Sequence, residues 1–287
     1  METFFEEEDR AVPPKYLYHY TNLGGTIGIL TSRSIWATDC LAMNDSREAT
    51  EVLRVLEHTI ENQFFRIGVK DQGWFHSLAI ELRKVQALRG SCIVSFSEHS
   101  DDLAQWRAYG GNGAGVAIGI LNSALSDLSN RVGFRLGKVI YDFEHQRRIC
   151  WRFTRWLFEK YGITERIDEF PAAMLKEIGD FVNSDGLLMK HDSFKSEAEW
   201  RIVRNVPDLY DVEWEYRASD NMIAPYTVIP AEQDVFCEQP FGGDLTYQLV
   251  LGPTCRRNPT SSCLQALNKK ITGHGIGQTL SASPYIT

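Results

Sequence analysis

The sequence predicts an α+β protein with a mixed or antiparallel central sheet, a helical hairpin and a helical insertion. The chain of 287 residues is 43% hydrophobic and 11% aromatic, which is enough for one large core. Its short β-type runs do not alternate regularly with helices, as a doubly wound parallel sheet would require. We therefore expect one domain over residues 15–287, with the insertion at about residues 144–190, after an acidic and flexible leader over residues 1–14.

The first part of the chain is predicted to contain two strands and three helices. An aromatic-rich alternating run over residues 16–20 is typical of a strand, and Asn22 can cap the short helix that follows it. A second strand is expected over residues 35–38. Apolar residues at helical spacing then predict a helix from about residue 48 and another over about residues 74–89, which would form a hairpin covering the sheet.

The rest of the chain is predicted to contain most of the sheet. Its β-type runs are bounded by glycine, asparagine and other turn residues, which is the pattern of short strands. A capped helix is expected from about residue 258. The predicted strands cover residues 92–97, 116–120, 134–141, 199–203, 212–216, 226–229 and 247–251, and an edge segment covers residues 279–286.

Composition limits the classes of partner. The net charge is −8, so the whole molecule repels polyanions and needs a local basic patch to hold nucleic acid. The six cysteines are scattered, and the sequence has no C-x-x-C pair and no histidine near a cysteine at the spacing of a zinc site. We therefore expect reduced thiols and no metal site. The start lacks the basic and apolar regions of a signal peptide, and no apolar run is long enough to span a bilayer. We expect a cytoplasmic protein without a membrane partner.

A first candidate site lies at the end of the first predicted strand. His19, Tyr20 and Thr21 place an imidazole and hydroxyls where the strand enters a glycine-containing helix start. Such groups can hydrogen-bond ribose hydroxyls, while exposed backbone groups hold an amide. The alternative is a half-buried strand histidine that is hydrogen-bonded to a carbonyl.

A second candidate combines small hydroxyl residues with aromatic rings. Ser95 and Ser97 alternate with Phe96, so they share one strand face, and Trp106 and Tyr109 lie at helical spacing. The two rings can supply a stacking wall for nicotinamide or adenine. Alternatively, they simply pack a short helix against the sheet.

A third candidate contains a pair of carboxylates. On a strand, Glu197, Glu199 and Arg201 would project from one face, with apolar residues on the other. This is either an active-site edge on a central strand or a salt-bridged ladder that contributes little to stability.

A fourth feature is a basic helix face. Arg148, Arg152 and Arg155 lie on one side of a predicted amphipathic helix, and this is the one concentrated positive surface in an acidic chain. The face is either solvated or a contact for nucleic acid or phosphate in an acceptor.

These motifs, in this order, resemble a large family of uncharacterised bacterial proteins. More remotely, they resemble the ADP-ribosyltransferase superfamily, in which a first-strand histidine, a middle strand of hydroxyl residues and a late glutamate surround NAD. Trp36, Trp106 and Tyr109 compete for the position of the aromatic residue of that pattern. The matching segments are Tyr18-His19-Tyr20-Thr21, Met43-Asn44-Asp45-Ser46-Arg47-Glu48, Ser95-Phe96-Ser97-Glu98, Gln105-Trp106-Arg107-Ala108-Tyr109-Gly110 and Glu197-Ala198-Glu199-Trp200-Arg201.

The resemblance implies a mechanism in which the bond between nicotinamide and ribose breaks through an oxocarbenium-like state. Glu199 would stabilise the positive charge that develops on the ribose, and Glu197 would orient or deprotonate the acceptor. Arg201 would either neutralise the pyrophosphate or hold Glu199 in place. Ribose hydroxyls would bind His19 and Thr21, and the carboxamide would bind the backbone of Tyr20.

The same resemblance implies the substrate and the partners. NAD would be consumed as a substrate, with no metal, and the acceptor would be nucleic acid or protein. Bacterial members of the superfamily often act as toxins or antiviral defence effectors, which implies such a role here and an antitoxin protein as a partner. Two other classes stay open: a non-catalytic nucleotide-binding or protein-interaction module, and a hydrolase that uses the paired carboxylates without NAD.

Overall fold

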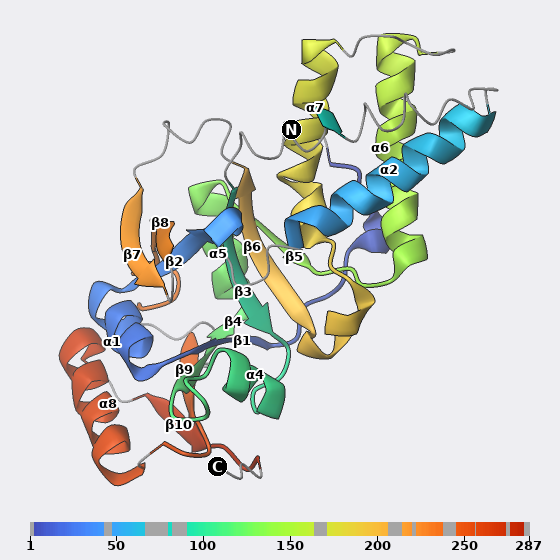
Figure 1. Cartoon of the computed structure of the whole chain (residues 1–287). Coiled ribbons are helices and arrows are strands. Elements are labelled where there is room, and N and C mark those ends of the chain that lie inside the picture. Colours follow the sequence, from blue (N-terminus) through green and yellow to red (C-terminus); the bar gives the residue numbers. More distant parts are fainter. Residues whose placement is uncertain are drawn as a thin grey trace.

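The computed structural model describes residues 3–42, 48–66, 80–81, 91–163, 171–205, 214–219, 222–237, 245–255, 257–273 and 276–283. Within these residues the predicted α+β class is confirmed, because helices surround an open sheet of ten strands (Figure 1). Every strand pair is antiparallel except β9 with β10, so the sheet is mixed but largely antiparallel.

The strands follow one path with a branch at β3. The branch consists of β6 (Glu199–Asn205), which pairs with β3 and with β5 (Arg135–Lys138). Along the main path the order is β10 (Gly277–Leu280), β9 (Tyr247–Leu251), β4 (Val116–Leu121), β1 (Tyr16–Thr21), β3 (Ser91–Ser97), β2 (Ser34–Asp39), β8 (Met222–Pro230) and β7 (Glu215–Ser219).

The sheet splits along one edge of β3. Strand β6 pairs with the whole length of β3, so β1 and β2 share the opposite edge. There β2 pairs with Ile93 and Cys92, whereas β1 pairs with Ser97. Residues 94–96 therefore have no strand partner on this edge among the described residues, and we call this split the fork.

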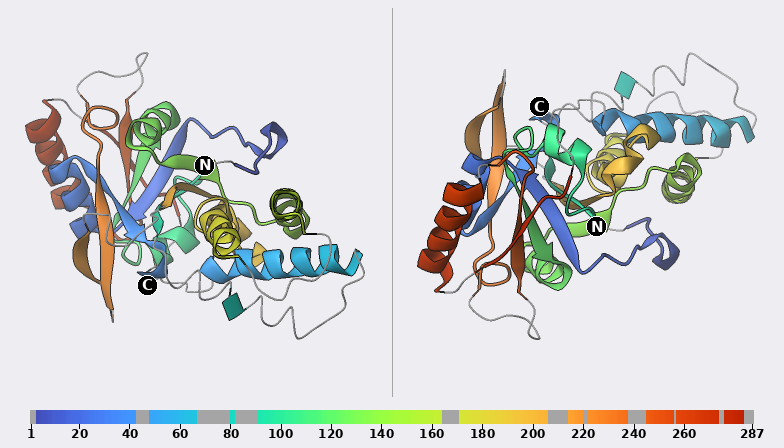
Figure 2. Two further views of the ribbon diagram at one scale, coloured as in Figure 1. Left: turned by 90° about the horizontal axis from the view of Figure 1, so that it is seen from above. Right: turned by 90° about the horizontal axis from the view of Figure 1, so that it is seen from below.

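The helices form two groups. Helices α2 (Glu48–Arg66), α6 (Phe143–Tyr161) and α7 (Ala172–Val182) stand together on one side of the sheet, away from α1 (Leu23–Ser32) and α8 (Arg257–Thr272) (Figures 1 and 2). Their apolar faces build a hydrophobic cluster of their own, separate from the one between the sheet and the other helices. The predicted insertion is thus a helical body packed on α2.

Local sequence signals explain several element boundaries. Asn22 caps α1 as predicted, with its Oδ1 accepting a hydrogen bond from the Gly25 amide at 2.8 Å. Asp102 caps the short helix α4 (Leu103–Ala108) in the same way, whereas α5 (Asn122–Val132) begins without a side-chain cap and ends at Gly133 in the left-handed region. None of the helices in the described part of the chain combines the length and the hydropathy of a bilayer span.

Some predicted elements differ from the structure. The expected strand at 134–141 is confined to β5. The one at 212–216 overlaps β7 from Glu215, and the edge segment at 279–286 overlaps β10 at residues 279 and 280. Residues 212, 213 and 284–286 of these predictions lie outside the described residues. Apart from residues 80 and 81, the predicted helix at 74–89 lies outside the described residues.

The acidic leader is packed, contrary to the prediction that it is flexible. The Phe4 ring lies 5.2 Å from that of Phe153 on α6, and Asp9 is buried. The apolar surface that the leader contacts is built by α6 and α7, which are distant in sequence. Local composition therefore does not predict this packing.

Candidate functional site

Four of the predicted site residues share one face of β3 and β6. In the antiparallel register Ser97 lies opposite Glu199 and Ser95 lies opposite Arg201. Directly paired residues point to the same side of a sheet, as do residues two apart on one strand. The two hydroxyls and the two charged groups therefore point to the same side.

Glu199 and Arg201 form a buried ion pair at the start of β6. Arg201 Nε donates to Glu199 Oε1 at 2.7 Å and its Nη2 donates to Oε2 at 3.0 Å. Both residues are almost fully buried. Burial alone would raise the pKa of Glu199, but the charges of Arg201 and Lys190 outweigh it and hold the pKa well below its ordinary value. Glu199 is therefore a fixed anion at neutral pH.

Lys190 completes this site and was missed from the sequence. Its Nζ lies 2.6 Å from Glu197 Oε2 and 3.1 Å from Glu199 Oε2, and its side chain is 3% exposed. The available signal was a single lysine after the apolar run 187–189. A lysine is rarely fully buried unless it is paired, so such a position indicates a hidden carboxylate partner. We call Lys190, Glu197, Glu199 and Arg201 the charge cluster.

The prediction that Glu197 projects from the strand is wrong. Glu197 is the last residue of the 3-10 helix Asp192–Glu197, and Ala198 follows it with a φ of 45° in the left-handed region. This turn interrupts the two-residue alternation that the prediction assumed. The carboxylate of Glu197 nevertheless reaches the charge cluster, where the hydroxyl of Tyr109 donates to it at 3.4 Å.

His19 lies at the fork. Its Nδ1 is 3.0 Å from the carbonyl oxygen of Ser95. Because a carbonyl only accepts, Nδ1 carries the proton and Nε2 is left as an acceptor, with no hydrogen bond to the described residues. Burial lowers the pKa of His19, which keeps the imidazole neutral. The alternative interpretation, a half-buried histidine bonded to a carbonyl, describes its Nδ1 contact.

The structure brings His19 and Glu199 to the same residue from opposite faces. His19 packs edge-on against Phe96, with ring centroids 5.9 Å apart, so it lies on the other side of β3 from Glu199. Ser95 stands between them. Its Oγ is buried beside Glu199, and a hydrogen bond from this hydroxyl contributes to the lowered pKa of Glu199.

Trp106 does not supply the predicted stacking wall. It is fully buried, its Nε1 donates to Asp101 at 2.7 Å, and its ring packs at 4.7 Å against that of Tyr20. The alternative interpretation, in which the ring packs a short helix against the sheet, is correct for this residue. Tyr109, at the end of α4, is 41% exposed and lies beside Glu197.

Tyr20 and Thr21, at the end of β1, both contact neighbouring segments. The Tyr20 hydroxyl donates to the His99 carbonyl at 2.8 Å and accepts from the Asp102 amide at 3.0 Å, so it is fully used. Thr21 is half-buried and packs directly beneath Gly25 of α1, where a Cβ would lie 2.1 Å from its Oγ1. Both side chains hold α1 and α4 on the sheet.

The arginine face of α6 is largely neutralised. Arg152 contacts three acids of the leader, Glu6, Glu8 and Asp9. Arg155 pairs with Glu159 on the next turn of the helix, while Arg148 is exposed. The continuous positive surface expected from helical periodicity is therefore interrupted, because acids distant in sequence pair with Arg152 and Glu159 of the same helix pairs with Arg155.

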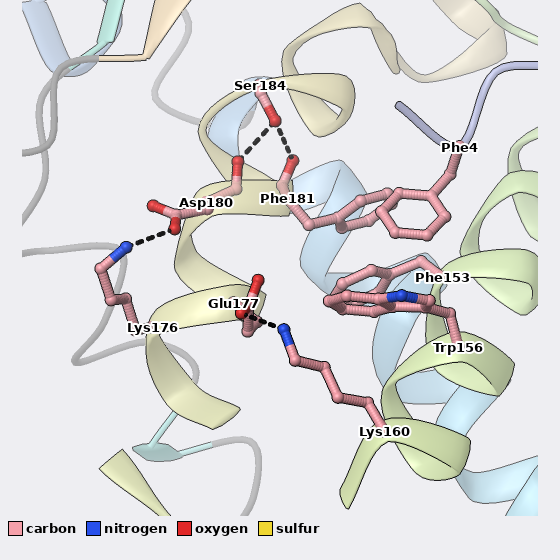
Figure 3. Close-up of a pocket in the computed structure, with 9 residues that line it drawn as sticks. All are labelled: Phe4, Phe153, Trp156, Lys160, Lys176, Glu177, Asp180, Phe181 and Ser184. Atoms are coloured by element: carbon pink, nitrogen blue, oxygen red, sulfur yellow. Dashed lines mark hydrogen bonds and ion pairs between the residues drawn. The ribbon is translucent and has the colours of Figure 1, made fainter. Parts of the chain in front are cut away.

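A separate pocket of about 550 Å³ opens between the leader, α6 and α7 (Figure 3). Aromatic rings lie on one side of it, and the Lys160–Glu177 and Lys176–Asp180 ion pairs lie on the other. None of the predicted catalytic or cofactor-binding residues lines it. Its lining residues are Phe4, Phe153, Trp156, Lys160, Lys176, Glu177, Asp180, Phe181 and Ser184.

Within the described residues no group of histidine, cysteine and acidic side chains is arranged to hold a metal.

The comparisons with known proteins give one match. No curated protein and no solved structure matches the chain. Residues 105–202 match the model of a family described as protein of unknown function (DUF2971), and this segment contains Tyr109 and the whole charge cluster.

Proposed function

We propose that the chain is an NAD-dependent ADP-ribosyltransferase. The observation that carries the proposal is the charge cluster, in which a glutamate is buried and kept ionised beside the buried hydroxyl of Ser95. Burying charges costs several kcal/mol per ion even when they are paired, and packed apolar residues would serve the core equally well. Perturbed carboxylates of this kind cluster at functional sites.

In the proposed reaction, Glu199 acts as a fixed negative charge. The bond between the ribose C1′ and the nicotinamide nitrogen breaks, and its electron pair passes to nicotinamide. Positive charge then develops on the ribose, and an anion held close by stabilises this state more than the ground state. Because Arg201 and Lys190 hold both oxygens of Glu199, it is positioned for electrostatic stabilisation and not for nucleophilic attack.

Glu197 takes the second role. The Glu197 side chain is 16% exposed against 6% for Glu199, so it is the carboxylate that an acceptor reaches. We assign to it the proton of the acceptor as the new bond to C1′ forms. We assign no ribose contact to His19, because it lies on the other face of β3 from Glu199. The acceptor, nucleic acid or protein, and a role as a toxin or defence effector with an antitoxin partner rest on the resemblance alone.

The test is nicotinamide release from NAD by the purified chain, followed with and without candidate acceptors. We expect Glu199→Gln to lower the rate at least 100-fold while melting temperature and circular dichroism still indicate a folded protein. Glu159→Gln, on the exposed face of α6, is the matched control and should retain the wild-type rate. Equal rates for Glu199→Gln and wild type would remove the proposed role.

A second candidate is a non-catalytic nucleotide-binding or protein-interaction module. One observation favours it: both oxygens of Glu199 are already occupied by protein cations. This candidate predicts that NAD binds to the wild-type protein without nicotinamide release. It also predicts that Glu199→Gln changes stability alone.

A further inference from the structure

A pyrophosphate needs a cation that Arg201 does not provide. The sequence suggested two roles for Arg201, neutralising the pyrophosphate or holding Glu199, and its contacts match the second. Two of its nitrogens bind Glu199, and Nη1 donates to the Leu187 carbonyl at 2.7 Å. With 1% of its surface exposed, its guanidinium is closed to a ligand.

Arg217 on β7 is an exposed arginine with no carboxylate partner in the described part of the chain. Its Nη2 donates to Thr38 Oγ1 on β2 at 2.8 Å, which directs the side chain across β8. Glu215, two residues earlier on the same strand, forms no ion pair with it. The guanidinium therefore keeps donors for an anion, and its planar fork suits phosphate oxygens.

Two aromatic rings accompany Arg217. Trp36 on β2 and Tyr226 on β8 lie with ring centroids 5.0 Å apart and an interplanar angle of 33°, and both are half-buried. The guanidinium of Arg217 lies 5.9 Å from the Tyr226 ring centre. Gly28 of α1 packs against the Trp36 indole, since a Cβ there would lie 3.1 Å from the ring. A partly exposed, supported ring pair is a platform on which a planar base can stack.

Strand register joins this platform to the fork. Thr38 pairs with Tyr226 on one side and with Ile93 of β3 on the other. Ser95, two residues after Ile93, points to the same side. Arg217 is also close enough for its charge to contribute to the lowered pKa of His19. The same side of the sheet thus carries an anion donor, a stacking platform and the fork.

We propose that Arg217, Trp36 and Tyr226 form a subsite for a nucleoside diphosphate, with Arg217 on the phosphates and the base on the rings. As the place of the ADP half of NAD, this subsite rests on the proposed function. Binding of free ADP does not require any transfer reaction, so the two ideas fail separately.

The experiment is calorimetric titration of the full chain with ADP. We expect saturable binding that Arg217→Gln weakens at least 10-fold and Arg217→Lys weakens less, because lysine keeps the charge and loses the fork. Arg54→Gln, at an exposed arginine of α2, should bind like the wild type. Tyr226→Leu should reduce the preference for ADP over inorganic pyrophosphate.

The outcomes separate cleanly. ADP binding that depends on Arg217 supports the subsite even when NAD is not cleaved, in which case only the transferase proposal fails. Absence of ADP binding to the wild type at millimolar concentration would overturn the subsite, and so would equal affinity of the wild type and a folded Arg217→Gln variant.

Discussion

The charge cluster and the arginine face of α6 use the same chemical pair at different depths. In the cluster, the Arg201 side chain is 1% exposed and that of Glu199 is 6% exposed, whereas Arg155 and Glu159 on α6 are 60% and 65% exposed. Water screens the surface pair and replaces either partner when one is lost. In the cluster both side chains are shielded from solvent, so a lost partner leaves a buried charge. The burial of an ion pair, and not the pairing itself, therefore decides how much each arginine contributes to stability.

The largest expected effect comes from breaking the buried pair. We expect Arg201→Met to lower the free energy of unfolding by about 3 kcal/mol, because it leaves the Glu199 carboxylate buried with Lys190 as its only cation. Urea denaturation of the variant and the wild type measures the loss. The double variant Arg201→Met with Glu199→Gln should recover part of it, and a loss below about 1 kcal/mol would contradict the comparison.

The pH dependence of stability sharpens the same comparison. The folded pKa of Glu199 lies below its ordinary value of 4.5, so its contribution is complete above that pH and disappears as pH falls through the folded pKa. We expect the unfolding free energy of the wild type to fall more steeply in acid than that of Glu199→Gln. Unfolding curves at a series of pH values test this. Parallel pH profiles would mean that the carboxylate is not held ionised.

Arg152 lies between the two extremes. Its side chain is 17% exposed, and its partner Asp9 in the leader is buried. Burial alone would raise the pKa of Asp9, but hydrogen bonds from the Glu6 amide, His145 and Arg152 outweigh this effect. The net pKa is lowered, so the carboxyl stays ionised. We expect Arg152→Ala to lower the free energy of unfolding, measured by urea denaturation, by about 1–2 kcal/mol, because a buried acceptor loses a charged donor.

The same experiment with Glu8→Gln provides the control. Glu8 also contacts Arg152, but its side chain is 68% exposed. Its loss should stay below about 0.5 kcal/mol. A larger effect for Glu8→Gln than for Arg152→Ala would show that the leader is held by surface charge and not by the buried Asp9.

The smallest effect is expected for Arg155→Ala. Solvent screens its pair with Glu159, so the unfolding free energy should change by no more than about 0.5 kcal/mol. Nicotinamide release, if present, should also be unchanged with a protein acceptor. A decrease confined to nucleic-acid acceptors, and removed by added salt, would restore the arginine face as a contact surface.

The strands and capped helices could be predicted because their signals are local. The alternation over residues 16–20 and 92–97 and the cap at Asn22 each act within a few residues, and β1, β3 and α1 appear where they were expected. Glu199 and Arg201 were also placed on one face, since this follows from the two-residue repeat of a strand.

The rest depended on contacts between distant segments. The position of Glu197 off the strand follows from the left-handed turn at Ala198, which no glycine or asparagine announces. The local sequence around Trp106 did not distinguish a buried side chain from an exposed one. The basic stripe of α6 was correct as a stripe, but the acids that pair with Arg152 come from residues 6–9, about 140 positions away in the chain.

The sequence by itself determined the α+β class, most of the strands, and the presence of a histidine, two hydroxyls and two carboxylates with an arginine. Only the tertiary structure decided that β1 and β2 diverge at Ser95, that Lys190 enters the charge cluster, and that His19 and Glu199 approach the fork from opposite faces. Local backbone preferences act over a few residues, whereas strand pairing and burial depend on which distant segments exclude water from one another.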